Sequence, residues 1–222
     1  NSGTGVCGDW AGTQDNVIRG CQFEGGRHGV CFTLGASAVI ENNWFRFQSE
    51  RAILGHDPGT LIIDSNHIDT TGSGGYCLLT FSGSGEYIIQ NNTMISDGII
   101  ICMYTSSMDI QCHGNHFVRK GDDAWYVHPG ESSASYHQGT LRVLDFTDNF
   151  WGTDDPNEVA AWIFDFYDDQ DYRYIIDSKH RWHTWAAPKD ANGQFDHNNA
   201  LTGSDLMDYV DNELFPYLKS FK

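Results

Sequence analysis

The sequence predicts an all-β fold, a parallel β-helix solenoid of about six coils followed by short C-terminal helices. The main observation is a recurring eight-residue pattern, in which an asparagine follows an aliphatic residue by three positions and precedes a large apolar residue by two. Clear copies occupy residues 38–45, 61–68 and 87–94, and weaker copies occupy 16–23, 110–117 and 144–151. The marker position falls at residues 21, 43, 66, 92, 115 and 149, with cysteine in place of asparagine at 21. We interpret each interval between markers as one structural repeat.

The residues within each repeat favour a β-helix over a leucine-rich horseshoe. Leucine is scarce at the fixed positions, and the strands are rich in β-branched and aromatic residues. A second apolar strand recurs about ten residues after a marker, at 29–33, 51–54, 76–80, 99–103 and 124–128. Equivalent positions on successive coils then stack about 4.8 Å apart. An inward asparagine at each turn is therefore expected to bond to its neighbours along the axis as a ladder.

These repeats resemble those of the right-handed, pectate-lyase-like single-stranded β-helix superfamily, over roughly residues 16–180. The segment from Asn149 to Pro156, continuing to Asp169, is similar to one that closes many secreted bacterial proteins of this kind. The resemblance implies a right-handed solenoid and a secreted or cell-surface protein. It implies no single activity, because the superfamily contains lyases, hydrolases, epimerases, phage spikes, metal-delivery proteins and modules without known activity.

Length and charge limit the organisation and the partners. The 222 residues carry 13 Lys and Arg against 30 Asp and Glu, a formal charge of −17. This balance argues against nucleic acid or an anionic membrane as a partner, and no apolar run is long enough for membrane insertion. We expect a β-helix over residues 1–180 and a C-terminal extension over 181–222 that packs on the solenoid. A homo-oligomer or a larger parent chain remains open.

Six cysteines leave two alternatives. They form at least one disulfide, or they are buried thiols stacked in the core. Cys77 and Cys102 lie at nearly equivalent places on adjacent coils and are the first candidate pair.

The region after the last marker carries helix signals. Asp155 is a suitable N-cap, Pro156 a suitable first helical residue and Glu158 a reciprocal capping partner, which predicts a helix from 156 to about 164. A strand is expected at 172–177, and a second helix begins after Ser204. The insertion at 129–140 lengthens one coil and is a candidate binding loop.

Two outward rows flank the marker turn. One row lies two residues before each marker and the other lies one residue after it. The first row is Arg19, Glu41, Asp64, Gln90 and His113, and the second is Gln22, Trp44, His67, Thr93 and His116. The rows are either a sugar-processing groove or a solvated face of the solenoid.

The groove interpretation gives each residue type a role. Glu41 and Asp64 could couple so that one carboxyl acts as an acid while the other stays ionised, with His113 and His116 as general bases. Trp44 would support a sugar face, with His67 and Gln90 as further substrate contacts. No cofactor is specified by the sequence. Calcium is considered because Glu41 and Asp64 could hold a divalent cation, which would acidify the α-proton of a uronate.

A second candidate lies near the insertion. Arg119 and Lys120 are rare positive charges that could bind a carboxylate or neutralise an enolate-like intermediate, unless they only pair with Asp122 and Asp123. The acidic run 165–171 could bind calcium, although a structural role fits it better.

Two functional hypotheses follow. The first is a secreted carbohydrate-active protein that binds an extracellular polysaccharide, and cleaves it if it is a lyase or hydrolase. The second is a non-catalytic structural or adhesion module of a larger surface, phage or appendage protein, with the outward apolar row Val39, Ile62 and Ile88 covered by a partner.

Overall fold

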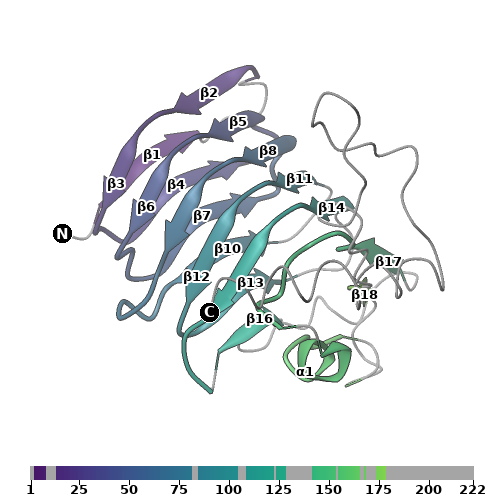
Figure 1. Cartoon of the computed structure of the whole chain (residues 1–222). Coiled ribbons are helices and arrows are strands. Elements are labelled where there is room, and N and C mark those ends of the chain that lie inside the picture. The colour runs from purple at the N-terminus through teal and green to yellow at the C-terminus, as the bar shows by residue number, and fades with distance from the viewer. Residues whose placement is uncertain are drawn as a thin grey trace, which may run out of the picture. The chain divides into compact units, whose positions relative to one another are not determined.

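The chain folds into a parallel β-helix, as the repeat predicts (Figure 1). The computed structural model describes residues 3–8, 14–81, 85–104, 109–122, 124–128, 142–153, 155–165, 168 and 174–178. Within these ranges, successive strands pair in parallel with the strand one coil away, and they form three sheets that we call A, B and C. The predicted all-β solenoid of about six coils is confirmed.

Each sheet collects one strand from each coil. Sheet A contains β1 (Thr4–Gly8), β4 (His28–Thr33), β7 (Arg51–His56), β10 (Tyr76–Phe81), β13 (Ile99–Met103) and β16 (Trp125–His128). Sheet B contains β2 (Asn16–Arg19), β5 (Ala38–Glu41), β8 (Thr60–Asp64), β11 (Glu86–Gln90), β14 (Asp109–His113), β17 (Arg142–Asp145) and β18 (Tyr174–Asp177). Sheet C contains β3 (Gln22–Glu24), β6 (Trp44–Arg46), β9 (His67–Asp69), β12 (Thr93–Ser96) and β15 (His116–Arg119).

A sharp turn joins sheet B to sheet C on every coil. The residue before each marker has positive φ, at Gly20, Asn42, Ser65, Asn91, Gly114 and Asp148, with values from 54° to 64°. Glycine, asparagine and aspartate tolerate this left-handed conformation better than other residues, which explains their use at five of the six places. The turn directs the five marker asparagines into the core, whereas the first marker, Cys21, is exposed.

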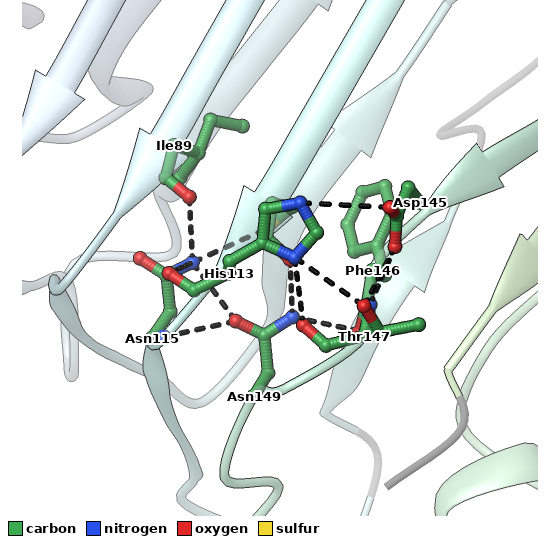
Figure 2. A network of polar contacts seen from close by, with 8 residues as sticks. Ile89, His113, Asn115, Asp145, Phe146, Thr147 and Asn149 are labelled. Atoms are coloured by element: carbon green, nitrogen blue, oxygen red, sulfur yellow. Dashed lines mark hydrogen bonds and ion pairs between the residues drawn. The ribbon is translucent and has the colours of Figure 1, made fainter. Parts of the chain in front are cut away.

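The markers form a continuous buried ladder. The side-chain amide of Asn43 donates to Oδ1 of Asn66 over 3.0 Å, and the same bond repeats from Asn66 to Asn92 to Asn115 to Asn149 at 2.9–3.0 Å. Each Oδ1 in turn also accepts the backbone N–H of the preceding marker, beginning with Cys21. Every turn is therefore bonded to the next through side chain and backbone together. Figure 2 shows the C-terminal end of this ladder.

Apolar rows fill the space between the three sheets. Sheet B contributes Ile18, Ile40, Ile63, Ile89 and Cys112, and sheet C contributes Phe45, Ile68, Met94 and Phe117. Phe23 extends the second row by stacking on Phe45, with ring centroids 4.8 Å apart. Side chains alternate between the core and the outer surface on both sheets, as predicted, and the outward side of sheet B carries both polar and apolar rows.

The C-terminal helix is present but shorter than predicted. Helix α1 spans Pro156–Ala160, and Oδ1 of Asp155 caps it by accepting the N–H of Asn157. After the helix, Trp162 and Ile163 donate to carbonyls three residues earlier, and the chain then pairs with sheet A through the bridge of Ile163 to Val127. The expected reciprocal cap is wrong, since Glu158 accepts the Thr153 hydroxyl instead. Val159 and Ile163 are buried in the core, and Trp162 packs against it.

Three predictions fall on residues outside the described ranges. These are the insertion at 129–140, the second helix after Ser204 and the packing of the extension 181–222 on the solenoid. Contacts divide the chain into two compact units, Asn1–Lys179 and His180–Lys222.

Cys77 and Cys102, the predicted cysteine pair, do not lie opposite each other in sheet A. Cys102 is the register partner of Leu79, two residues beyond Cys77. Cys77 instead contacts the Thr70 hydroxyl, with sulfur and oxygen 3.6 Å apart. The proposed Cys77–Cys102 disulfide is therefore wrong, because the turns that lead into sheet A differ in length between coils.

The ladder predicts a large cost for Asn92→Ala. The substitution removes the acceptor of two Asn66 N–H groups and the donor to the Ile63 carbonyl, all in the buried interior. We expect the free energy of unfolding to fall by about 2–4 kcal/mol. Urea unfolding followed by circular dichroism measures it.

Asn42→Gly is the matched control. Asn42 is exposed at the turn position before the marker Asn43, with φ of 54°, which glycine adopts readily. A change below about 0.5 kcal/mol is expected there. Equal effects of the two substitutions would contradict a structural role for the ladder.

Candidate functional site

The two predicted rows lie on either side of the turn between sheets B and C. Register pairing places Arg19, Glu41, Asp64, Gln90 and His113 on successive strands of sheet B. It places Gln22, Trp44, His67, Thr93 and His116 on successive strands of sheet C, and a bridge from His116 extends this row to Phe150. The rows therefore have the order that the repeat predicts.

The two carboxylates of the first row are engaged by different partners. Glu41 forms an ion pair with Arg19 on the preceding coil. Asp64 accepts hydrogen bonds from the Ser65 hydroxyl at 2.8 Å, the Gln90 amide at 3.0 Å and the Asn91 amide at 3.1 Å. Gln90, predicted as a substrate contact, thus holds Asp64 in this structure.

The surroundings of Asp64 favour its charged form. Partial burial opposes ionisation, but the hydrogen bonds from Gln90, Asn91 and Ser65 outweigh it and lower the pKa below the ordinary 3.8. Asp64 is thus ionised at neutral pH, whereas Glu41 is engaged by Arg19. In the predicted carboxylate pair, Asp64 has the properties of the member that stays ionised rather than of the acid.

His113 is held by the coil that follows it (Figure 2). Its Nδ1 lies 3.0 Å from the carbonyl oxygen of Thr147, which can only accept, so Nδ1 carries a proton. Its Nε2 lies 3.6 Å from Oδ2 of Asp145. Nδ1 is therefore engaged within the protein, and Nε2 faces a carboxylate without a hydrogen bond to it.

His116 lies against an aromatic side chain. Its ring meets Phe150 edge to face, with centroids 4.7 Å apart. Burial lowers the pKa of His116 below 6.5, so its imidazole is neutral at pH 7.

The first three coils carry an aromatic cluster and a hollow. Trp44 is 40% exposed and meets the His67 ring edge to face at 5.8 Å. The guanidinium of Arg46 lies 5.1 Å from the Trp44 ring and 4.8 Å from that of Phe47, which is 44% exposed. Beside Trp44 is an open hollow of about 550 Å³, lined by Gly20, Cys21, Gln22, Asn42, Asn43, Trp44, Ser65 and His67.

The second candidate region is held by internal contacts. Arg119 ends β15, three residues beyond His116, and donates to the carbonyl oxygens of Ala124 and Asp122. Its guanidinium also stacks 3.7 Å from the Trp162 ring centroid. Arg119 thus fixes the turn into sheet A and is not part of the two rows, while the adjacent Lys120 is exposed. Asp123 and the insertion are not among the described residues.

Two carboxylates of the acidic run 165–171 accept hydrogen bonds from backbone N–H groups. Asp165 is buried, and its Oδ2 accepts the N–H of Ile176 at 2.9 Å. Oδ2 of Asp168 accepts the N–H of Asp165 at 3.0 Å. Across the described part of the chain, no group of three or more His, Cys, Asp or Glu is arranged to hold a metal ion.

Sequence reasoning missed several residues of the hollow and its rim. Asn42 and Ser65 belong to neither predicted row, although each lines the hollow next to Trp44. Phe47 and Arg46 were not singled out because they lie beyond the eight-residue pattern. The sequence did contain a signal for them, because a second aromatic residue, Phe47, follows Trp44 by three positions with Arg46 between them.

The comparison with protein families agrees with the observed fold. A family model described as a right-handed β-helix region matches residues 2–144, more than half of the chain. The chain therefore belongs to the right-handed β-helix family. No significant match was found among curated proteins or among solved structures. In the described ranges, no helix is long and apolar enough to cross a membrane.

The hydrogen bonds to Asp64 predict a pH effect on stability. A carboxyl with a lowered pKa stabilises the fold above its unfolded-state pKa, and this contribution is lost as the pH falls through the folded-state pKa. Gln90→Ala should move the pKa of Asp64 up toward 3.8, as read by a carboxyl carbon NMR titration. The wild type should then lose more stability than the variant below about pH 4.

Gln111→Ala is the control for this titration. Gln111 is an exposed glutamine on the same sheet, in the next outward row. It should leave the Asp64 titration unchanged. An Asp64 pKa at or above 3.8 in the wild type would refute the assignment.

Proposed function

We propose that the protein is a secreted or cell-surface carbohydrate-binding β-helix, and that it holds a polysaccharide in the hollow beside Trp44. The observation that carries this proposal is the grouping of an exposed tryptophan with amide, hydroxyl and imidazole groups on three successive coils. Sugar recognition needs an apolar surface for the ring face and a few placed donors and acceptors for the hydroxyls. The hollow offers both.

The charge distribution favours a neutral saccharide. None of the residues that line the hollow carries a carboxylate, and its polar groups come from Gln22, Asn42, Asn43, Ser65 and His67. The formal charge of −17 on the whole chain would repel a polyuronate. In addition, Arg19 is already engaged by Glu41, which leaves it less able to attract an anion.

Binding is better supported than cleavage. A glycosidase needs one carboxyl that holds a proton near neutral pH, whereas Asp64 is stabilised as a carboxylate and Glu41 is ion-paired. Nδ1 of His113 is hydrogen-bonded to the Thr147 carbonyl, and its Nε2 lies 3.6 Å from the Asp145 carboxylate. Lyase or hydrolase activity along Glu41, Asp64, His113 and His116 would require these contacts to change when substrate binds.

The second candidate is a structural or adhesion module, and the outward apolar row of sheet B favours it. Val17, Val39, Ile62 and Ile88 are register neighbours on successive strands. Val17 is 57% exposed, while the other three are half-buried. A partner chain on sheet B would cover this row and leave the hollow open. Analytical ultracentrifugation of the wild type and a Val17→Ser, Ile62→Ser variant distinguishes a self-associating module from a monomer.

Trp44→Ala tests the binding proposal. Loss of the aromatic surface should weaken binding of a neutral oligosaccharide at least tenfold, about 1.4 kcal/mol. Isothermal titration calorimetry against neutral and acidic oligosaccharides, with and without calcium, provides the measurement. The same mixtures report cleavage through new reducing ends or unsaturated-product absorbance, with Glu41→Gln, Asp64→Asn as the comparison.

Phe150→Ala is the matched control. Phe150 lies in the same outward row as Trp44 and is 39% exposed, but it stands at the other end of the solenoid. Its loss should leave the affinity within twofold of the wild type. Equal weakening by both substitutions, or no binding by the wild type across the panel, would contradict the assigned site.

A further inference from the structure

Two cysteines of sheet A lie side by side at its N-terminal end. Cys7 of β1 is the register partner of Cys31 of β4, between the pairs Val6–Val30 and Gly8–Phe32. The structure holds all six cysteines as thiols. We propose that Cys7 and Cys31 form a disulfide that fastens strand β1 to the solenoid.

The strand geometry suits this bond. Register partners on neighbouring parallel strands lie about 4.8 Å apart and point to the same face of the sheet. A disulfide needs Cα atoms roughly 4.4–6.8 Å apart. The Cβ atoms of a disulfide lie slightly closer than strand spacing provides, at roughly 3.8 Å. Strand β1 can make this small approach, because it ends the order of sheet A and four of its five residues are exposed.

The other cysteines lack such a neighbour. Cys21 occupies the marker position, where the next coil presents Asn43. Cys77, Cys102 and Cys112 are buried, and burial raises the pKa of Cys77 and of Cys102 to about 12 and that of Cys112 well above 9.0. Thiolates are the reactive form, so these three react slowly with an oxidant.

The exposed Cys7 gives the reaction a starting point. Its thiolate attacks a small-molecule disulfide such as glutathione disulfide, which forms a mixed disulfide and releases one thiol. Cys31 is itself buried, but its partner sulfur lies on the neighbouring strand, so no small-molecule oxidant has to reach it. The Cys31 thiolate attacks the Cys7 sulfur and displaces the second thiol. One protein disulfide forms, two thiols are released and the two cysteine protons leave with them.

The bond would stabilise the coil that carries part of the hollow. A Cβ on Gly5 of β1 would lie 2.6 Å from the Gly29 carbonyl oxygen and 2.8 Å from the Phe23 ring, so β1 packs closely over both. Phe23 belongs to the strand that begins at Gln22, and Gly20, Cys21 and Gln22 line the hollow. A fastened β1 should therefore restrict opening of the first coil.

Peptide mapping of the full chain tests the proposal directly. The purified protein is equilibrated with glutathione disulfide, alkylated under acidic conditions before unfolding, digested and analysed by mass spectrometry. We expect a Cys7–Cys31 linked peptide that dithiothreitol removes and that persists in Cys21→Ser. Alkylation of both Cys7 and Cys31, or linkage of Cys7 to Cys21 or to a second chain, would overturn it.

Hydrogen exchange gives a second readout that does not depend on saccharide binding. Oxidation should slow exchange of the β1 and β2 amides at least tenfold in the wild type and in Cys21→Ser. In Cys7→Ser, which alters an exposed side chain, oxidation should have no effect on these amides. Equal protection of the oxidised and reduced wild type would contradict the fastening role, whatever the outcome of the saccharide titrations.

Discussion

The asparagine ladder is the interaction on which the rest of this structure depends. A sharp turn between sheets B and C leaves backbone groups that the strands cannot satisfy, and these groups lie in the buried interior. Each marker asparagine satisfies them with one side chain, by donating to a carbonyl below the turn and accepting the N–H of the neighbouring coil. Because unpaired polar groups are costly in the core, the turns must stack in register. That register fixes the outward rows on either side.

The same turn is exposed on its outer side, and there the coils differ. At the N-terminal end, Gly20 and Cys21 replace the bulkier turn residues, and the hollow opens beside Trp44. At the C-terminal end, Asp145, Thr147 and Phe150 from a later coil contact His113 and His116. One scaffold thus presents an open polar and aromatic surface at one end and a closed network at the other.

Much of the fold could be predicted because the period is visible in the residues themselves. The ladder was predicted from the markers at 43, 66, 92, 115 and 149, and both outward rows were predicted from the alternation of side chains around them. The prediction of a Cys77–Cys102 pair was wrong because the turns that precede the strands of sheet A have unequal lengths. The register of sheet A therefore cannot be counted from the markers. The contacts of individual side chains could not be predicted from the sequence either. The contacts of His113 with Thr147 and of Arg119 with Trp162 join residues whose proximity is set by the last, longest coil and by the chain after β17.

Saccharide binding by the coils beside Trp44 can be tested most directly by NMR of the tryptophan indole N–H signals during a titration with a neutral oligosaccharide, because the seven tryptophans are spread along the chain. We expect a saturable shift of the Trp44 signal, with those of the buried Trp151 and of Trp125 on sheet A unchanged. Saturable shifts confined to other tryptophans, with Trp44 unmoved, would contradict it.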